Sequence, residues 1–236
     1  MSTEQWGQLC VLPDANLFHL LIDQNLDIND LENIELLVAP FVVVDTVRDE
    51  LTEKLESLDL PARTVWDHAV WHRNQRYENL LRANRRDPFD SLKEINRIRD
   101  WALPMLHSFV PSLSDADAFL LASSFWIRSR TNVEPIIVAE DRGILFACHV
   151  LSSYIGMSVG VHSIFELMRL TGLQDYVGAY SDGYRTPFPR VSLPSDQSRD
   201  GIVRDVEIML KRGKLGTHPQ LSARDGIRRI TPRDRS

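Results

Sequence analysis

Short apolar runs of strand type, each followed by apolar residues at helical spacing, constrain the fold of this chain more than any other feature. The runs lie at residues 9–12, 41–44 and 136–139, and a last short one at 158–161 precedes a last apolar helix. A buried strand reads as a continuous apolar run, whereas an amphipathic helix repeats its apolar residues every three to four positions. Alternation of this kind predicts a three-layer α/β/α sandwich with a central, mostly parallel sheet.

Residues 61–107 depart from the alternation. They are polar and rich in arginine, with scattered aromatic and aliphatic residues, and the helical pattern breaks near Asp87-Pro88. We expect an inserted helical hairpin here. Its basic side chains favour either a solvated helix face or a groove for a polyanion. They are Arg73, Arg76, Arg82, Arg85, Arg86, Arg97 and Arg99.

The composition predicts one domain over residues 1–180 and a polar, basic and partly helical extension over 181–236. Of the 236 residues, 43% are hydrophobic and 25% are charged, which is typical of a globular protein with a sizeable core. The formal net charge is −6, yet basic residues outnumber acidic ones about two to one from residue 199 onward. Such a tail fits a polyanionic partner or plain solvated surface.

The sequence predicts a soluble, cytoplasmic protein without membrane contact. The first residues lack the basic start and apolar core of a secretory signal. The longest apolar stretch, 36–44, is interrupted by Pro40 and is far shorter than the roughly 20 residues of a membrane helix. Cys10 and Cys148 have no second cysteine at metal-ligand spacing, so we expect buried, reduced thiols.

Four carboxylates stand where the predicted strands end or where the next helices begin. They are Asp14, Glu50, Asp117 and Asp141. Ligands of open α/β folds bind outside the carboxyl ends of the parallel strands, so these side chains can converge although they are far apart in sequence. Crowded carboxylates repel one another unless a cation neutralises them, and hard oxygen ligands select Mg²⁺ or Mn²⁺. The pattern therefore predicts a metal site.

Each acid also has a purely structural interpretation. Asp14 can cap the helix that follows it. Ser114 and Asp117 have a spacing close to that of a capping box. Asp141 can be a turn residue, and Glu50 can face solvent on an amphipathic helix. The metal-site hypothesis depends on the joint placement of the acids.

The segments that contain the four acids resemble the four acidic motifs of the PIN-domain nucleases. These segments are 11–16, 42–51, 114–118 and 137–142. Residues 156–161 and the apolar helix after them are similar to the last strand and helix of that family. The resemblance covers residues 8–60 and 110–175. It implies a compact α/β/α sandwich that cleaves phosphodiester bonds, usually in RNA, with Mg²⁺ or Mn²⁺.

The resemblance also implies roles for particular residues. The catalytic metal ligands would be Asp14, Glu50, Asp117 and Asp141, with Asn16 and Ser114 as supporting residues. Successive helical residues turn by about 100°, so Asp115 and Asp117 point to roughly opposite sides of a helix. The family pattern places its acid directly before a small-apolar run, which begins here with Ala118, and so favours Asp117. Asp115 could still reach a second metal if it precedes the first full turn.

The expected reaction is in-line hydrolysis of RNA by a metal-activated water. Basic residues would hold the phosphate backbone, the candidates being Arg82, Arg85, Arg86 and Arg142. The segment 61–107 is longer than its equivalent in the small toxin-type members, and the tail after residue 180 has no counterpart there. Pairing with an antitoxin is therefore left open, and an inhibitory or regulatory protein partner and a homo-oligomer are both compatible with the sequence.

Two other functions fit parts of the pattern. A non-catalytic PIN-like module that binds RNA or a protein would need none of the four acids. A phosphohydrolase with Asp14 as covalent nucleophile commonly has a second acid two residues later, where this chain has Asn16.

His68 and His72 have the spacing of a zinc pair, yet Ala69 stands where zinc proteases have glutamate, so we interpret them as helix-face histidines.

Overall fold

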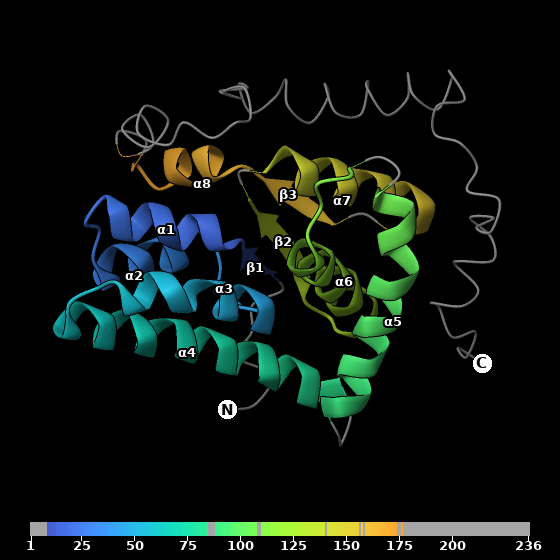
Figure 1. Cartoon of the computed structure of the whole chain (residues 1–236), viewed down its shortest axis with the longest axis horizontal. Coiled ribbons are helices and arrows are strands. Elements are labelled where there is room, and N and C mark those ends of the chain that lie inside the picture. Colours follow the sequence, from blue (N-terminus) through green and yellow to red (C-terminus); the bar gives the residue numbers. More distant parts are fainter. Residues whose placement is uncertain are drawn as a thin grey trace.

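A computed structural model of the chain describes residues 9–84, 88–107, 110–139, 141–155, 157, 159–173 and 176. These residues form three strands and eight helices. The strands build one parallel sheet in the order β1-β2-β3, and the helices lie around it (Figure 1). The described chain is therefore a mixed α/β protein with a small, open, parallel sheet, and this part of the fold prediction is confirmed.

Three of the four apolar runs correspond to strands, and six helices separate the first strand from the second. The strands are β1 Leu9–Pro13, β2 Glu134–Val138 and β3 Gly160–His162. The helices are α1 Ala15–Asp23, α2 Ile28–Leu37, α3 Asp45–Glu56, α4 Leu60–Asn84, α5 Pro88–His107, α6 Asp115–Arg130, α7 Arg142–Ile155 and α8 Ile164–Leu170.

Strands β1 and β2 are distant in sequence and adjacent in the sheet. Their register pairs Leu9 with Glu134 and Pro13 with Val138. The backbone N–H of Asp14 continues this ladder, since it donates to the carbonyl oxygen of Val138 at 2.8 Å. Because the two strands are parallel, their carboxyl ends lie at the same edge of the sheet. Residues that follow either strand are thereby brought together.

The apolar run at 41–44, predicted as a strand, pairs with the sheet at one residue only. Phe41 forms a parallel bridge with Val11 of β1. The outer backbone groups of Phe41 bind side chains instead of another strand. Its N–H donates to the carboxylate of Glu35 at 2.7 Å, and its carbonyl accepts from Arg76 at 3.1 Å. Charged side chains thus end the sheet where β propensity alone predicts a further strand.

Helix α2 was not predicted from the sequence. Its start is a capping box, in which the Asp27 carboxylate accepts from the N–H of Asp30 at 3.1 Å and the Asp30 carboxylate accepts from the N–H of Asp27 at 2.9 Å. Only Leu31 and Ile34 are buried along the helix. Two buried positions give only a weak apolar period, so helical spacing does not mark this segment in the sequence.

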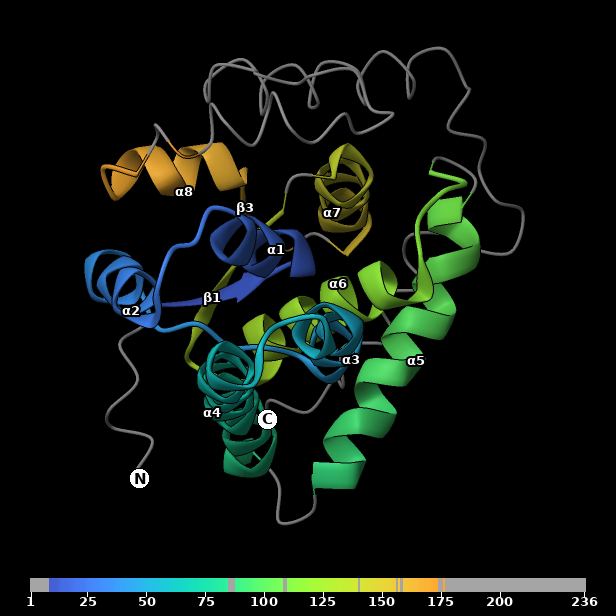
Figure 2. The ribbon, with the colours of Figure 1, turned by 60° about the vertical axis from the view of Figure 1, so that its left-hand side comes forward.

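The predicted insertion at 61–107 forms the long helices α4 and α5, but they are not a simple hairpin. Helix α4 lies along α2 and α3, whereas α5 packs along α6 and α7, so the two helices diverge (Figures 1 and 2). Tyr77 of α4 and Ile95 of α5 are buried in the same core as β1 and α6. These helices are therefore integral to the core, because each buries its apolar side against a different neighbour.

The last strand and helix are close to their predicted positions. Strand β3 is shifted by a residue or two from the predicted 158–161, and α8 is followed by Gly172 with φ +76°, a conformation that favours glycine. Among the described helices none is long and apolar enough to cross a membrane. The predicted extension at 181–236 lies outside the described residues.

Candidate functional site

Asp14 directly follows β1 and opens α1, so the backbone on both sides fixes its position. One carboxylate oxygen caps α1 by accepting from the N–H of Ala15 at 2.8 Å. The other oxygen accepts from the side-chain amide of Asn16 at 2.8 Å. Asp14 is therefore an N-cap, as its structural interpretation predicted, and the amide of Asn16 orients its carboxylate.

The surroundings of Asp14 are unfavourable for a negative charge. The residue is only 5% exposed. Burial, and then the like charges of Asp117 and Glu50, raise the pKa of Asp14 from 3.8 to about 7, although the hydrogen bonds from Asn16 and Ala15 lower it. The carboxyl group of Asp14 is therefore stable here either in its protonated form or as a carboxylate next to a cation.

Helix α6 begins with a capping box that holds the third acid. The hydroxyl of Ser114 accepts from the N–H of Asp117 at 3.0 Å, and the carboxylate of Asp117 accepts from the N–H of Ser114 at 2.9 Å. Burial raises the pKa of Asp117, the two Ser114 bonds lower it, and the charge of Asp141 raises it again. Asp115 is exposed at the helix start. Asp117 is thus the acid of this pair that lies among the others.

Asp141 follows β2 at the same sheet edge as Asp14. Its carboxylate accepts from the N–H of Gly143 at 2.5 Å, in the first turn of α7. A Cβ atom at position 143 would stand 2.9 Å from the side chain of Val110 and 3.0 Å from Oδ1 of Asp141. Gly143 therefore allows Asp141 to approach the start of α7. Arg142 is the first residue of that helix, and its side chain lies outside the described structure.

Glu50 lies on the surface of α3, one turn beyond the start of that helix. Partial burial raises the pKa of its carboxyl, and the charge of Asp117 raises it further. The surface position agrees with the structural interpretation of Glu50. The influence of Asp117 shows that the same carboxyl also belongs to the surroundings of the other acids.

The four predicted acids share one electrostatic neighbourhood with Asp117 at its centre. After burial, the charge of Asp117 is the next cause of the raised pKa values of Asp14 and Glu50, and the charge of Asp141 makes a smaller contribution to the raised pKa of Asp117. Coulomb energies fall with distance, so these couplings require nearby carboxylates. Helices α1, α6 and α7 begin at this place, and the N–H groups of their first turns carry positive partial charge.

The donor chemistry of this neighbourhood suits a divalent cation. Carboxylate oxygens are the ligands that Mg²⁺ and Mn²⁺ prefer, and a cation would relieve the repulsion felt by Asp14. Within the described part of the chain, no three His, Cys, Asp or Glu side chains stand close enough together to hold a metal ion. Mg²⁺ commonly keeps several waters and binds one or two carboxylates, so this spacing and that metal are compatible.

No family model matches the chain, and neither a curated protein nor a solved structure matches it. The resemblance of the acidic segments to PIN-domain nucleases therefore stays a prediction from short motifs. The placement of Asp14 and Asp141 after β1 and β2, and of Asp117 in the first turn of α6, is an observation that does not depend on relatives.

The arginines predicted to hold substrate are only partly described. Arg82 is exposed on α4 and pairs with Glu78 at 2.8 Å, as expected of a solvated helix face. Arg85 and Arg86 lie outside the described residues. Arg73 is only 3% exposed, and both it and Arg76 bind Glu35. Of the two predicted alternatives, a solvated helix face is therefore wrong for Arg73, whereas Arg76 is partly exposed and lines a pocket.

In the absence of divalent metal ions, the free energy of unfolding is expected to fall as pH rises from about 4 to about 7. The folded state raises the pKa of Asp14 from 3.8 to about 7, so it binds that proton more tightly than the unfolded state does. Full ionisation then costs the fold on the order of 4 kcal/mol. Urea titrations in EDTA at several pH values would measure the slope. An equal slope in Asp14→Asn would contradict this origin.

Gly143 was not among the predicted site residues, because Asp-Arg-Gly reads as a turn. Alanine at position 143 is expected to lower the free energy of unfolding by about 1–3 kcal/mol through overpacking against Val110 and Asp141. The usual gain of about 1 kcal/mol from replacing a helical glycine would offset part of this loss. Urea unfolding of wild type and Gly143→Ala would measure the difference. A more stable variant would show that Val110 moves aside freely.

Proposed function

We propose that this chain is a metal-dependent endoribonuclease of the PIN type, which hydrolyses phosphodiester bonds in RNA with Mg²⁺ or Mn²⁺. The observation that carries the proposal is the coupling of four acids from separate segments at one edge of a parallel sheet. Capping explains Asp14 and Asp117 singly. It does not explain why a buried carboxylate stands beside like charges, which is costly unless a cation binds there.

The chain's own residues would divide the work at this site. A bound divalent cation would polarise the scissile phosphate and lower the pKa of a coordinated water. Asp14 and Asp141 would hold it, since hydrogen bonds from the starts of α1 and α7 fix both carboxylates. Asp117, tied to Ser114, would complete the negative charge around the cation. Glu50 is exposed and has a raised pKa, which suits it to orient a water or accept its proton.

The substrate would be held by groups of positive charge around the acids. The first turns of α1, α6 and α7 offer N–H donors to phosphate oxygens. The arginines that we propose for the RNA backbone are Arg82, Arg85, Arg86 and Arg142. An RNA chain is the partner that this chemistry implies. An inhibitory or regulatory protein partner and a homo-oligomer belong to the same proposal.

The finer features of the fold and of the cellular setting belong to the same proposal. A three-layer α/β/α sandwich over residues 1–180, with a basic extension over 181–236, is the arrangement that a PIN-type enzyme would have. A cytoplasmic location fits two free, buried cysteines, because burial raises the pKa of the Cys10 and Cys148 thiols to about 12 and makes both unreactive.

Incubation of the purified full chain with structured and unstructured RNA, with Mn²⁺ or with EDTA, tests the proposal. Cleavage that requires Mn²⁺ and is lost in EDTA is expected. Calorimetric titration of Mn²⁺ into the wild type and Asp14→Asn forms a second arm. The absence of both cleavage and carboxylate-dependent heat would favour a non-catalytic PIN-like binding module. A trapped phosphorylated Asp14 would instead indicate a phosphohydrolase with a covalent intermediate.

A further inference from the structure

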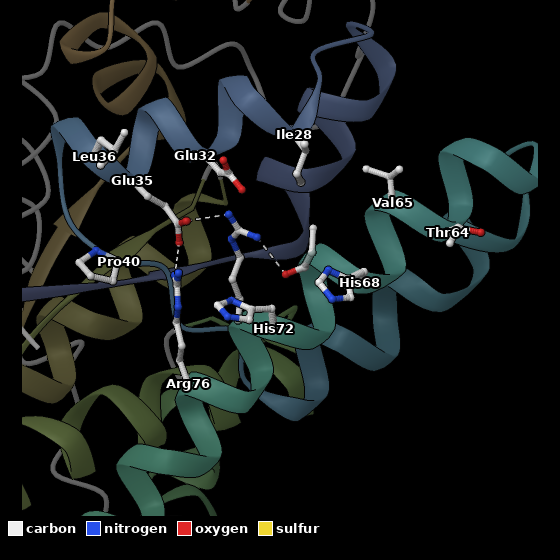
Figure 3. A pocket seen from close by; sticks show the side chains of 12 residues that line it. Ile28, Glu32, Glu35, Leu36, Pro40, Thr64, Val65, His68, His72 and Arg76 are labelled. Atoms are coloured by element: carbon white, nitrogen blue, oxygen red, sulfur yellow. Dashed lines mark hydrogen bonds and ion pairs between the residues drawn. The ribbon is translucent and has the colours of Figure 1, made fainter. Parts of the chain in front are cut away.

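A pocket of about 780 Å³ lies between α2 and α4 and is separate from the four acids in its lining residues. Its size falls within the range of ligand-binding pockets in general. Side chains of the two helices face one another across it, with Glu32 and Glu35 on α2 and His68, His72 and Arg76 on α4 (Figure 3). This mixture of charged, aromatic and apolar lining is typical of a binding site rather than a packing defect.

The floor of the pocket carries more positive than negative charge. Glu35 accepts from Arg73 at 2.6 Å, and it also pairs with Arg76, so two guanidinium groups share one carboxylate. The Nε atom of Arg73 is buried and has no hydrogen-bond partner within the described structure. Glu32 adds a negative charge, but it lies exposed on α2. Glu35, Arg73 and Arg76 together carry one net positive charge, which the exposed Glu32 balances over the pocket as a whole. An anionic group is therefore favoured beside Arg76, away from Glu32.

The imidazole of His72 feels the charges of the same two guanidinium groups. Burial lowers its pKa first, and the charges of Arg76 and Arg73 lower it further, against the opposing effect of Glu35. Binding of a further cation next to these two guanidinium groups is therefore unfavourable. The spacing of His68 and His72 resembles a zinc pair, yet a divalent metal would meet two guanidinium groups and too few ligands. The pair is better suited to stacking and to hydrogen bonding with an anion.

Histidine rings and aliphatic side chains line the pocket, and the ring of Trp71 stands next to His68 outside this lining. The ring of His68 lies 6.5 Å from that of His72 at an angle of 24°, and 6.1 Å from the ring of Trp71, which is 52% exposed. Val65 of α4 and Leu36 of α2 remain exposed beside these rings, although both line the pocket. An exposed row of rings beside aliphatic groups offers a surface on which a planar heterocycle can stack.

We propose that the pocket between α2 and α4 binds a nucleotide, with its base against the ring of His68 and its phosphate toward Arg76. The exposed carboxylate of Glu32 can accept a hydrogen bond from an exocyclic amine of the base. The inference deepens the proposed nuclease function, on which it rests for the source of the nucleotide, a single-stranded RNA chain. A free nucleotide would have the same chemistry, and the experiment separates the two sources.

Binding of a fluorescein-labelled, single-stranded RNA oligonucleotide to the full chain in EDTA tests the inference, with anisotropy as the readout. His68→Glu is expected to weaken binding about tenfold, because a stacking ring is lost. The matched control is Asn33→Glu, which adds the same charge at an exposed position of α2 outside the pocket. His68→Phe keeps a ring and is expected to bind within about twofold of wild type.

The outcomes distinguish the source of the nucleotide and the class of ligand. Tight binding of the oligonucleotide and weak competition by AMP support an RNA subsite, whereas equal competition by AMP supports a free nucleotide. Equal affinities of His68→Glu and Asn33→Glu would overturn the inference, as would competition by poly-glutamate as strong as by RNA. Cleavage with Mn²⁺ is measured separately. Normal RNA binding without cleavage would refute only the nuclease proposal. Cleavage together with unchanged RNA binding by His68→Glu would refute only the inference that the pocket binds a nucleotide.

Discussion

Asparagine in place of Asp14 is expected to reduce Mn²⁺-dependent RNA cleavage by at least about a hundredfold. Loss of residues that merely support a metal ligand commonly costs 10- to 100-fold, and Asp14 would be a ligand itself. Asparagine can still accept from Ala15, so the cap of α1 is retained. Cleavage of a labelled RNA at saturating Mn²⁺, with circular dichroism as a check of folding, would measure the effect.

The same assay separates the four acids from other acids of the chain. Asp141→Asn and Asp117→Asn are expected to lose activity as Asp14→Asn does. Asp100→Asn, which removes an exposed carboxylate paired with Arg99 on α5, serves as the matched control and should retain it. Asp115→Asn decides the open choice at the third position. Full activity in both Asp14→Asn and Asp141→Asn would refute the metal-dependent mechanism.

Replacement of Glu35 by alanine is expected to lower the free energy of unfolding by about 3–5 kcal/mol. This carboxylate neutralises the buried guanidinium of Arg73, pairs with Arg76 and accepts from the N–H of Phe41. Removal of one partner from a buried ion pair leaves an uncompensated charge, which costs much more than the pair itself contributes. Equilibrium urea unfolding at pH 7 would measure the loss.

Two variants give this experiment its controls. Glu32→Ala removes a carboxylate from the same helix at an exposed position, and it is expected to change stability by less than about 0.5 kcal/mol. Glu35→Gln keeps an acceptor for the N–H of Phe41 but not the negative charge, so its loss should fall between the other two. A similar stability of Glu35→Ala and Glu32→Ala would show that Arg73 finds another partner or reaches water.

The sequence predicted the parts of the fold whose signals are local. Strands β1 and β2 and the helices after them follow from continuous apolar runs and from helical spacing nearby. The run at 41–44 shows where this reasoning ends, because its outer edge is occupied by Glu35 and Arg76 rather than by a strand. Propensity describes the segment alone, whereas pairing depends on which groups reach it from elsewhere in the chain.

The residues of the candidate site likewise fall into those that the sequence predicts and those that depend on how distant segments pack. Asp14 and Asp141 could be predicted because each follows a strand directly, and parallel strands end at one edge. The central position of Asp117 could not, since it depends on how α6 approaches that edge. The pocket between α2 and α4 was predicted only in part, as a groove lined by basic side chains of residues 61–107. Its buried arginine bonds to a glutamate 38 residues away, on a helix whose sequence has only a weak apolar period.

The side chains that bind Phe41 have a consequence for how copies of this protein meet. A sheet edge with free N–H and C=O groups is a template on which another chain can add a strand. Here the N–H and the carbonyl of Phe41 are both already bonded, to Glu35 and Arg76. The side chains of Glu35 and Arg76 thus block the addition of another strand at Phe41, which disfavours edge-to-edge aggregation. Loss of Glu35 would therefore leave a folded protein that is prone to self-association through this sheet edge.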